Sequence, residues 1–211
     1  MPTKTFFNLP EEKRNKLLEA IHEEFSRVSF EEVSINQIIR MAGIPRGSFY
    51  QYFEDKKDML RYLLSDYQEM LKGHALVSLE RNGGDLFQMF LDIFDFTYGY
   101  VTEEKNNAFF KNLFADISVN AEFLRHRAHK AGQNTFGEFI GELLPYIDMD
   151  ALDIRNEDDF GNMLGVLLPL TGEAFTTAFF DISGYAQIRL RYTQRLELLK
   201  RGFLKAKGAK T

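Results

Sequence analysis

The sequence contains no cysteine and no tryptophan, and only five of its 211 residues are proline. Without cysteine the chain can form neither a disulfide nor a Cys-ligated zinc or iron–sulfur site, and it has no thiol nucleophile. The scarcity of proline and the lack of sustained apolar/polar alternation favour long helices joined by short turns. No apolar run has the length of a signal peptide or a membrane span, so we expect a cytoplasmic protein with no membrane partner.

The net charge is −5, from 26 basic and 31 acidic residues, which taken alone disfavours a nucleic-acid partner. The charge is unevenly distributed. Residues 1–60 carry nine basic and ten acidic residues, residues 61–186 carry nine and twenty, and residues 187–211 carry eight and one. The acidity therefore belongs mainly to the middle of the chain and does not exclude DNA binding by the first 60 residues.

Helix signals predict an all-α fold, with short helices near the amino terminus and longer ones beyond. The predicted helices cover residues 10–27, 34–43, 46–53, 56–82, 85–101, 106–118, 120–144, 157–181 and 184–206. Residues 145–159 hold six acidic residues and one arginine and predict a surface loop.

Residues 34–53 have the features of a helix-turn-helix. Ser34, with Gln37 three positions later, forms a capping-box pattern that opens the first short helix. Gly43 permits the sharp turn that follows it. Phe49 and Phe53 are expected in the core of this domain. The first helix can then pack across the second while the second presents polar side chains to a DNA groove.

The second of these helices is the predicted recognition helix. Arg46 can form a bidentate pair with a guanine edge, and Gln51 with an adenine edge. We expect Arg46, Ser48, Gln51 and Tyr52 to be exposed, and the hydroxyls of Ser48, Tyr50 and Tyr52 to reach bases or phosphates. Lys56 begins the next helix, where it can add a phosphate contact together with backbone N–H groups.

These residues resemble the TetR-type bacterial transcriptional repressors over about residues 12–64. The resemblance is carried by Ala42-Gly43-Ile44-Pro45-Arg46-Gly47-Ser48-Phe49-Tyr50, followed by Tyr52-Phe53 and Asp55-Lys56. It implies a three-helix DNA-binding domain over residues 1–55, a connecting helix over 56–82, and a helical ligand-binding and dimerisation domain within 56–211. Dimers are implied to form through the last two long helices.

The resemblance also implies how individual residues meet DNA. Ser34 would cap against a phosphate, the helix from Arg46 would read the major groove, and Tyr50, Tyr52 and Lys56 would touch the backbone. The predicted DNA-binding set is Ser34, Gln37, Arg46, Gly47, Ser48, Tyr50, Gln51, Tyr52 and Lys56.

Fifteen of the 21 phenylalanines lie after residue 60. At helical spacings they suit a packed core, and some of them could instead line a pocket for a small, largely apolar effector. Tyr98 and Thr176 could supply polar contacts in such a pocket. The predicted ligand-binding set is Phe90, Phe94, Tyr98, Phe110, Phe114, Phe136, Phe139, Met163, Phe175, Thr176 and Phe179.

The sequence offers no residues for an enzymatic site. His126 and His129 are three apart, but no carboxylate stands at a matching position on the same turn, so we expect no metal. His22-Glu23-Glu24 lacks the second histidine of a zinc-protease helix. The sequence has no nucleophile elbow, phosphate loop or dinucleotide fingerprint, and no cofactor is expected.

The function predicted from the sequence is a ligand-responsive DNA-binding regulator, acting as a homodimeric repressor that an apolar effector releases from double-stranded operator DNA. Two alternatives stay open. The chain could be a helical ligand-carrier or interaction protein that does not read DNA, or a transcriptional activator of the same fold.

Overall fold

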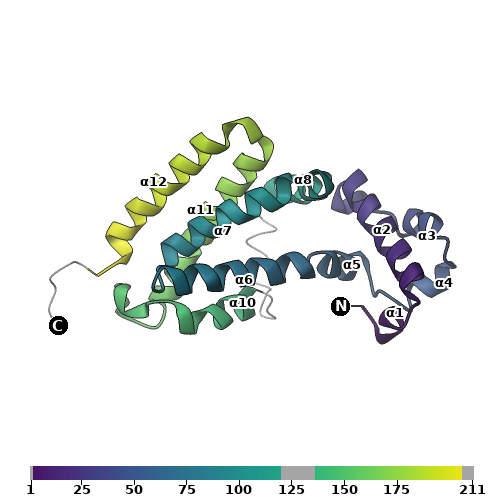
Figure 1. Ribbon diagram of the computed structural model, residues 1–211, viewed down its shortest axis with the longest axis horizontal. Coiled ribbons are helices and arrows are strands. Elements are labelled where there is room, and N and C mark those ends of the chain that lie inside the picture. The colour runs from purple at the N-terminus through teal and green to yellow at the C-terminus, as the bar shows by residue number, and fades with distance from the viewer. Residues whose placement is uncertain (1, 120–135, 206–211) are drawn as a thin grey trace. The chain divides into compact units, whose positions relative to one another are not determined.

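The computed structural model describes residues 2–119 and 136–205, and every regular element in these residues is helical (Figure 1). The α-helices are α1 (Lys4–Phe7), α2 (Glu11–Arg27), α3 (Ile35–Ala42), α4 (Arg46–Phe49), α5 (Lys56–Leu63), α6 (Ser65–Arg81), α7 (Leu86–Thr102), α8 (Glu104–Val119), α10 (Phe136–Leu143), α11 (Asp159–Phe180) and α12 (Tyr185–Phe203). Short 3-10 turns are η1 (Phe30–Glu32), η2 (Leu144–Tyr146), η3 (Met149–Ala151) and η4 (Ile182–Gly184). The predicted all-α class is confirmed.

The chain forms two compact units. The first holds the residues up to Met70 together with α8, and the second holds Leu71–Glu103 together with the described residues from α10 onward. The α8 helix belongs to the first unit because it packs against α2. Asn112 of α8 donates to the carbonyl oxygens of Phe25 and Ser26, at 3.3 and 2.8 Å, where α2 ends. These bonds tie α8 to α2.

The amino-terminal unit differs from the sequence prediction at two short helices. No sequence signal predicts α1, because its single turn is too short to show a helical period. The recognition helix α4 spans four residues instead of the two turns expected over 46–53. A tight turn follows α4, in which the N–H groups of Tyr52 and Phe53 both donate to the carbonyl of Phe49.

The connecting helix predicted over residues 56–82 is two helices, α5 and α6, that meet at Leu64. The hydroxyl of Ser65 donates to the carbonyl of Tyr62 at 2.7 Å, next to the interruption. Serine side chains that bond the nearby backbone compete with helical hydrogen bonds, which accounts for a break at this place.

Residues 145–159 are more firmly anchored than a surface loop. Ile147 and Leu152 are buried, and Leu152 forms an isolated β-bridge with Leu204 at the end of α12. Of the helix predicted over 120–144, the structure describes the part from Phe136; His126 and His129 lie outside the described residues.

The core of the second unit lies where α7, α11 and α12 pack together. Thr171 of α11 and Tyr192 of α12 are both buried there, with their hydroxyl oxygens 2.7 Å apart. Since Thr171 donates its proton to the carbonyl of Leu167, Tyr192 is the donor between the two hydroxyls. Burial raises the pKa of Tyr192, so this phenol stays protonated.

The hydrogen bond between Thr171 and Tyr192 predicts that substituting one partner destabilises the protein more than substituting the other. Thr171→Val should lower the free energy of unfolding by about 1–3 kcal/mol, because the Tyr192 hydroxyl would remain buried without its acceptor. Tyr192→Phe should cost less, since Thr171 still donates to Leu167. Chemical denaturation of both variants measures the difference. An equal loss, or a greater loss for Tyr192→Phe, would contradict the assigned direction of the bond.

The α11 helix is long and apolar enough to cross a membrane, judged by length and composition alone, although no apolar run of that length was expected from the sequence. Its most apolar 18 residues have a mean hydropathy of 1.4. Buried side chains from Met163 to Phe179 nevertheless pack within the second unit, which is also typical of a core helix.

Candidate DNA-binding surface and aromatic core

The first half of the helix-turn-helix is held by caps at both ends of α3. Ser34 Oγ accepts a hydrogen bond from the backbone N–H of Gln37 at 3.4 Å, as the capping pattern predicts. Gly43 ends the helix in the left-handed conformation, with φ of 66°. Ile38 and Ala42 on the inner face are buried. These contacts fix the helix that crosses behind α4.

The reciprocal half of the predicted capping box is different. The N–H of Ser34 donates to the carboxylate of Glu24, at 3.0 Å, instead of to the side chain of Gln37. Glu24 is fully buried in α2, and the guanidinium of Arg27 donates to both of its oxygens at 2.9–3.0 Å. No sequence motif predicts this link, and it leaves the partly exposed side chain of Gln37 available for another contact.

The α4 helix presents a polar outer side on an apolar inner anchor. Phe49 is fully buried, whereas Arg46 and Gln51 are exposed and Tyr50 is 53% exposed. Ser48 was expected to be exposed but is half-buried, because it directly precedes the buried Phe49 in a helix of one turn. Arg46 makes no ion pair with any residue in the described ranges. A Cβ added at Gly47 would meet no atom within 4 Å, so the folded chain itself leaves room there. The helix can therefore receive a ligand along this side.

Two further members of the predicted DNA-binding set are placed differently from the rest. Tyr52 was expected to be exposed, but it is 8% exposed because the tight turn after Phe49 carries it into the core beside buried Phe53. Lys56 donates to the carbonyls of Phe30 and Glu31, at 3.1 and 2.9 Å. Its ammonium thus secures η1 in the folded chain, and its phosphate contact stays a prediction.

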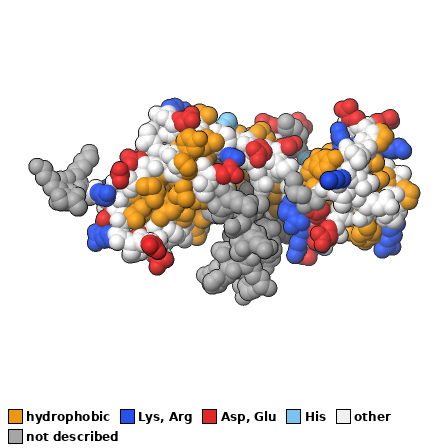
Figure 2. Space-filling view, turned by 90° about the horizontal axis from the view of Figure 1, so that it is seen from below, with side chains coloured by type: hydrophobic (Ala, Val, Ile, Leu, Met, Phe, Trp, Pro, Cys, Tyr) orange, Lys and Arg blue, Asp and Glu red, His pale blue; other side chains and the backbone are white. Residues whose placement is uncertain are grey.

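The surface of the first unit carries both basic and acidic side chains. On the face drawn in Figure 2, basic and acidic side chains are interspersed over the first unit, with apolar side chains between them. No broad positive field is required for sequence reading, because base contacts specify while phosphate contacts position. We expect modest non-specific affinity for DNA and a dependence on individually placed side chains.

The predicted ligand-binding residues separate into groups in the structure. The buried members are Phe90, Phe94, Phe110, Met163 and Phe179, and the half-buried members are Tyr98, Phe139, Phe175 and Thr176. The side chains of Phe114 and Phe136 lie outside what the structure describes. Phe110 belongs to the first unit, where its ring lies 5.2 Å from Tyr67 and 5.0 Å from Phe109.

An aromatic cluster in the second unit brings together several of the remaining residues. Phe94 is fully buried, and its ring lies 5.4 Å from Phe175 and 5.1 Å from Tyr192. Tyr185 stacks on Phe94 at 5.9 Å and on Tyr98 at 3.9 Å. Rings at these distances contribute packing energy beyond the area they bury. Phe94 is thus packed by neighbouring rings.

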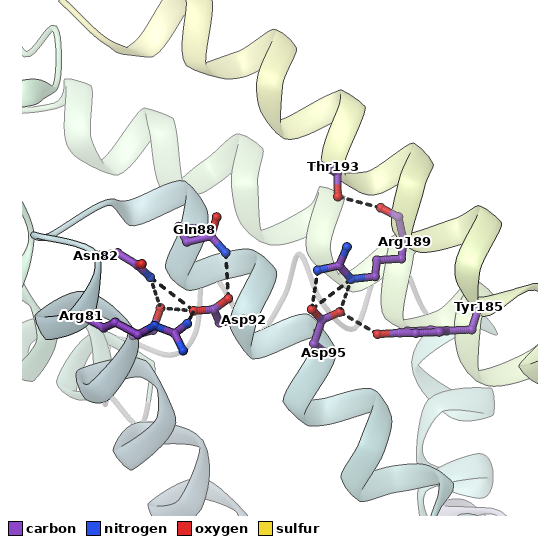
Figure 3. Close-up of polar contacts among 9 residues, drawn as sticks. Arg81, Asn82, Gln88, Asp92, Asp95, Tyr185, Arg189 and Thr193 are labelled. Atoms are coloured by element: carbon purple, nitrogen blue, oxygen red, sulfur yellow. Dashed lines mark hydrogen bonds and ion pairs between the residues drawn. The ribbon is translucent and has the colours of Figure 1, made fainter.

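A polar bridge beside this cluster was not predicted. Asp95 of α7 accepts from Tyr185, at 2.6 Å, and from the Nε and a terminal nitrogen of Arg189, each at 2.7 Å (Figure 3). Burial and the bond to Asp95 raise the pKa of Tyr185. The only local hint was an acidic residue within the apolar run of α7. The bridge fastens the start of α12 to α7.

A second carboxylate on the same helix joins α7 to α6. Asp92 accepts from Ser78 and Arg81, both at 2.6 Å, and from Gln88 at 2.8 Å (Figure 3). Burial alone would raise the pKa of Asp92, but the hydrogen bonds from Ser78 and Gln88 and the charge of Arg81 hold it below its usual value. Asp92 is therefore a structural anion.

Comparison with known proteins matches two family models to two stretches of the chain. Residues 17–63 match the family described as bacterial regulatory proteins, tetR family, and residues 85–203 match the tetracyclin repressor-like C-terminal domain. The HTH-type transcriptional regulator YdgC of Bacillus subtilis is 32% identical over 72 residues, which cover 34% of this chain and 37% of that protein.

Two solved structures share the fold. NalD, the secondary repressor of the MexAB-OprM multidrug efflux pump in Pseudomonas aeruginosa, is 19% identical with a TM-score of 0.57, covering 92% of this chain and 98% of its own. A TetR family regulator from Shewanella sp. PV-4 is 17% identical with a TM-score of 0.55, covering 92% and 99%. At these identities the likeness concerns the fold.

Proposed function

The chain belongs to the TetR family of bacterial regulatory proteins, and on that premise we propose that it is a ligand-responsive repressor that acts as a homodimer in the cytoplasm. Members of the family are DNA-binding transcriptional regulators, not enzymes; they act as dimers and are typically repressors. The observation that carries the proposal is the polar outer side of α4, where Arg46, Tyr50 and Gln51 are exposed beside buried Phe49.

Each protomer would place α4 in the major groove of one half-site. Arg46 and Gln51 supply donors and acceptors for base edges, while Ser34, Ser48 and Tyr50 supply hydroxyls for the backbone. Two such helices related by a two-fold axis read a pseudo-palindromic operator whose half-sites lie about 34 Å apart.

Capture of DNA tests this proposal. The purified chain, incubated with genomic fragments and a large excess of competitor DNA, is expected to retain fragments that share an inverted repeat. Folded protein that retains no fragment in preference to the competitor would refute DNA reading and favour the ligand-carrier alternative.

The effector is proposed to be small and largely apolar, because half-buried Tyr98, Phe139 and Phe175 border the packed core of the second unit and offer aromatic surface with few polar groups. Its binding would shift the dimer to a spacing that no longer fits the operator. Such a shift needs only a difference in effector affinity between the two states, typically about 1–3 kcal/mol. The α6 helix, which begins in the first unit and ends in the second, is the proposed route of coupling.

A matching effector is expected to raise the melting temperature and to weaken operator binding, because it binds the folded state and favours the form that cannot bind DNA. Fatty acids, acyl thioesters and hydrophobic cations are suitable probes. Thermal shift and gel shift are measured on the same samples. If no probe changes either quantity, the apolar effector is not supported.

The dimer is proposed to form through α11 and α12. These helices pack side by side and leave large apolar side chains exposed: Val166 and Phe180 on α11, and Leu190 and Leu198 on α12. Exposed apolar groups gathered on two long neighbouring helices suit an antiparallel four-helix interface with a second copy.

Leu198→Glu is expected to shift the protein from dimer to monomer at micromolar concentration, because a carboxylate would be buried at the interface without a partner. Val77→Glu is the matched control, since both side chains are 61% exposed and Val77 lies on α6. Sedimentation velocity measures the two populations. A dimeric Leu198→Glu variant, or a monomeric Val77→Glu variant, would place the interface elsewhere.

A further inference from the structure

The N-terminal arm, residues 2–7, is bonded to the turn that follows the recognition helix. The N–H of Thr3 donates to the carbonyl of Tyr52 at 2.9 Å, and its hydroxyl donates to the carbonyl of Gln51. The arm is fixed by Phe6, which is fully buried with its ring 5.0 Å from Phe53. These contacts hold the arm against a turn that lies almost fifty residues later in the chain.

The recognition helix needs support of this kind. A single helical turn is not stable by itself, because nucleation fixes several backbone dihedrals for one hydrogen bond. The orientation of α4 is therefore set by what holds its ends. The carbonyls of Gln51 and Tyr52 lie just beyond the helix, where backbone acceptors need partners from outside it, and Thr3 supplies both.

The next residue along the arm is a cation. Lys4 is exposed and forms no ion pair with any residue between 2 and 119 or between 136 and 205. It follows Thr3 directly, so its Cα is about 3.8 Å from that of a residue bonded to Gln51. Gln51 is exposed on the side of the domain proposed to face DNA. A lysine side chain at this place can reach a backbone phosphate beside the groove that α4 enters.

We propose that the N-terminal arm is a second DNA-contacting element, in which Thr3 positions the recognition helix and Lys4 binds a phosphate of the duplex backbone. This inference rests on the proposed operator binding. An arm that served only to anchor the amino terminus would need Phe6 in the core, but not two hydrogen bonds to the turn that carries Gln51.

The test measures operator affinity across a series of salt concentrations for Thr3→Val, Thr3→Ser, Lys4→Gln and the charge-matched control Lys205→Gln. Lys205 is exposed at the end of α12, in the other unit. Thr3→Val should weaken binding about fivefold per protomer, the effect of one ordinary hydrogen bond, and Thr3→Ser should restore it. Lys4→Gln should reduce the slope of log K against log salt by about 0.9 per protomer, with an unchanged melting temperature.

The outcomes separate the two proposals. A wild-type slope for Lys4→Gln, a slope reduced equally by Lys205→Gln, or wild-type affinity for Thr3→Val would overturn the inference while wild-type operator binding stands. Failure of Thr3→Ser to restore affinity would also overturn it, because the hydroxyl would then not be what positions α4. Failure of the wild-type chain itself to prefer an operator would refute the proposed function instead.

Discussion

Phe94→Ala is expected to lower the free energy of unfolding by about 3–5 kcal/mol, the usual loss for a large aromatic side chain removed from a packed core. Phe94 is fully buried and is packed by the rings of Phe175, Tyr185 and Tyr192. These neighbours come from α11 and α12, so the cavity would lie where both helices meet α7. For a chain of this size the melting temperature should fall by about 6–20 °C.

The same variant distinguishes a core from a pocket. If Phe94 lined an open ligand cavity, its truncation would merely enlarge that cavity and cost little. Tyr146→Ala is the control, because Tyr146 is an aromatic residue that is 45% exposed, and its loss should change stability by about 0.5 kcal/mol or less. A loss below about 1 kcal/mol for Phe94→Ala would contradict the packed aromatic cluster and support the pocket.

Replacing both Arg46 and Tyr50 with alanine is expected to weaken operator binding by about a hundredfold or more. One good bidentate contact to a base contributes about 1–3 kcal/mol of discrimination, and a dimer makes each contact twice. Both side chains are exposed, so the melting temperature should be nearly unchanged. Fluorescence anisotropy with operator DNA at fixed salt measures the loss.

The two single variants distinguish base reading by Arg46 from sequence-independent binding by Tyr50. Arg46→Ala should relax the preference for one base pair in each half-site, whereas Tyr50→Ala should weaken all sequences about equally. Arg201→Ala is the control, since Arg201 is exposed in the last turn of α12. Wild-type affinity in the double variant, or an equal loss in Arg201→Ala, would exclude α4 as the reading element.

The helix-turn-helix could be predicted because its signals are local. Ser34 caps the start of α3 and Gly43 ends it, through contacts that reach no further than four residues. Phe49 belongs to an apolar pattern that is equally short in range. Long helices such as α2 and α11 can likewise be predicted, because their apolar residues recur at helical spacing over several turns. Their predicted bounds lie within two residues of those found.

What could not be predicted depends on contacts between distant residues. The burial of Tyr52 follows from the turn after Phe49 and from the arm that Thr3 brings to it, nearly fifty residues away in sequence. The bridge from Asp95 to Arg189 joins positions more than ninety residues apart. A polar residue in an apolar helix signals that some partner exists, but the sequence does not say which.

Sequence-specific binding of DNA through α4 can be measured as a ratio of two affinities. The most direct measurement is the ratio of the chain's affinity for the inverted repeat recovered by DNA capture to its affinity for a scrambled duplex of the same composition, at the same salt concentration. Sequence reading by α4 predicts a ratio of about a thousand or more for the wild-type dimer, falling steeply in the variant that lacks Arg46 and Tyr50. Equal affinities for the two duplexes, measured with folded dimer, would contradict it.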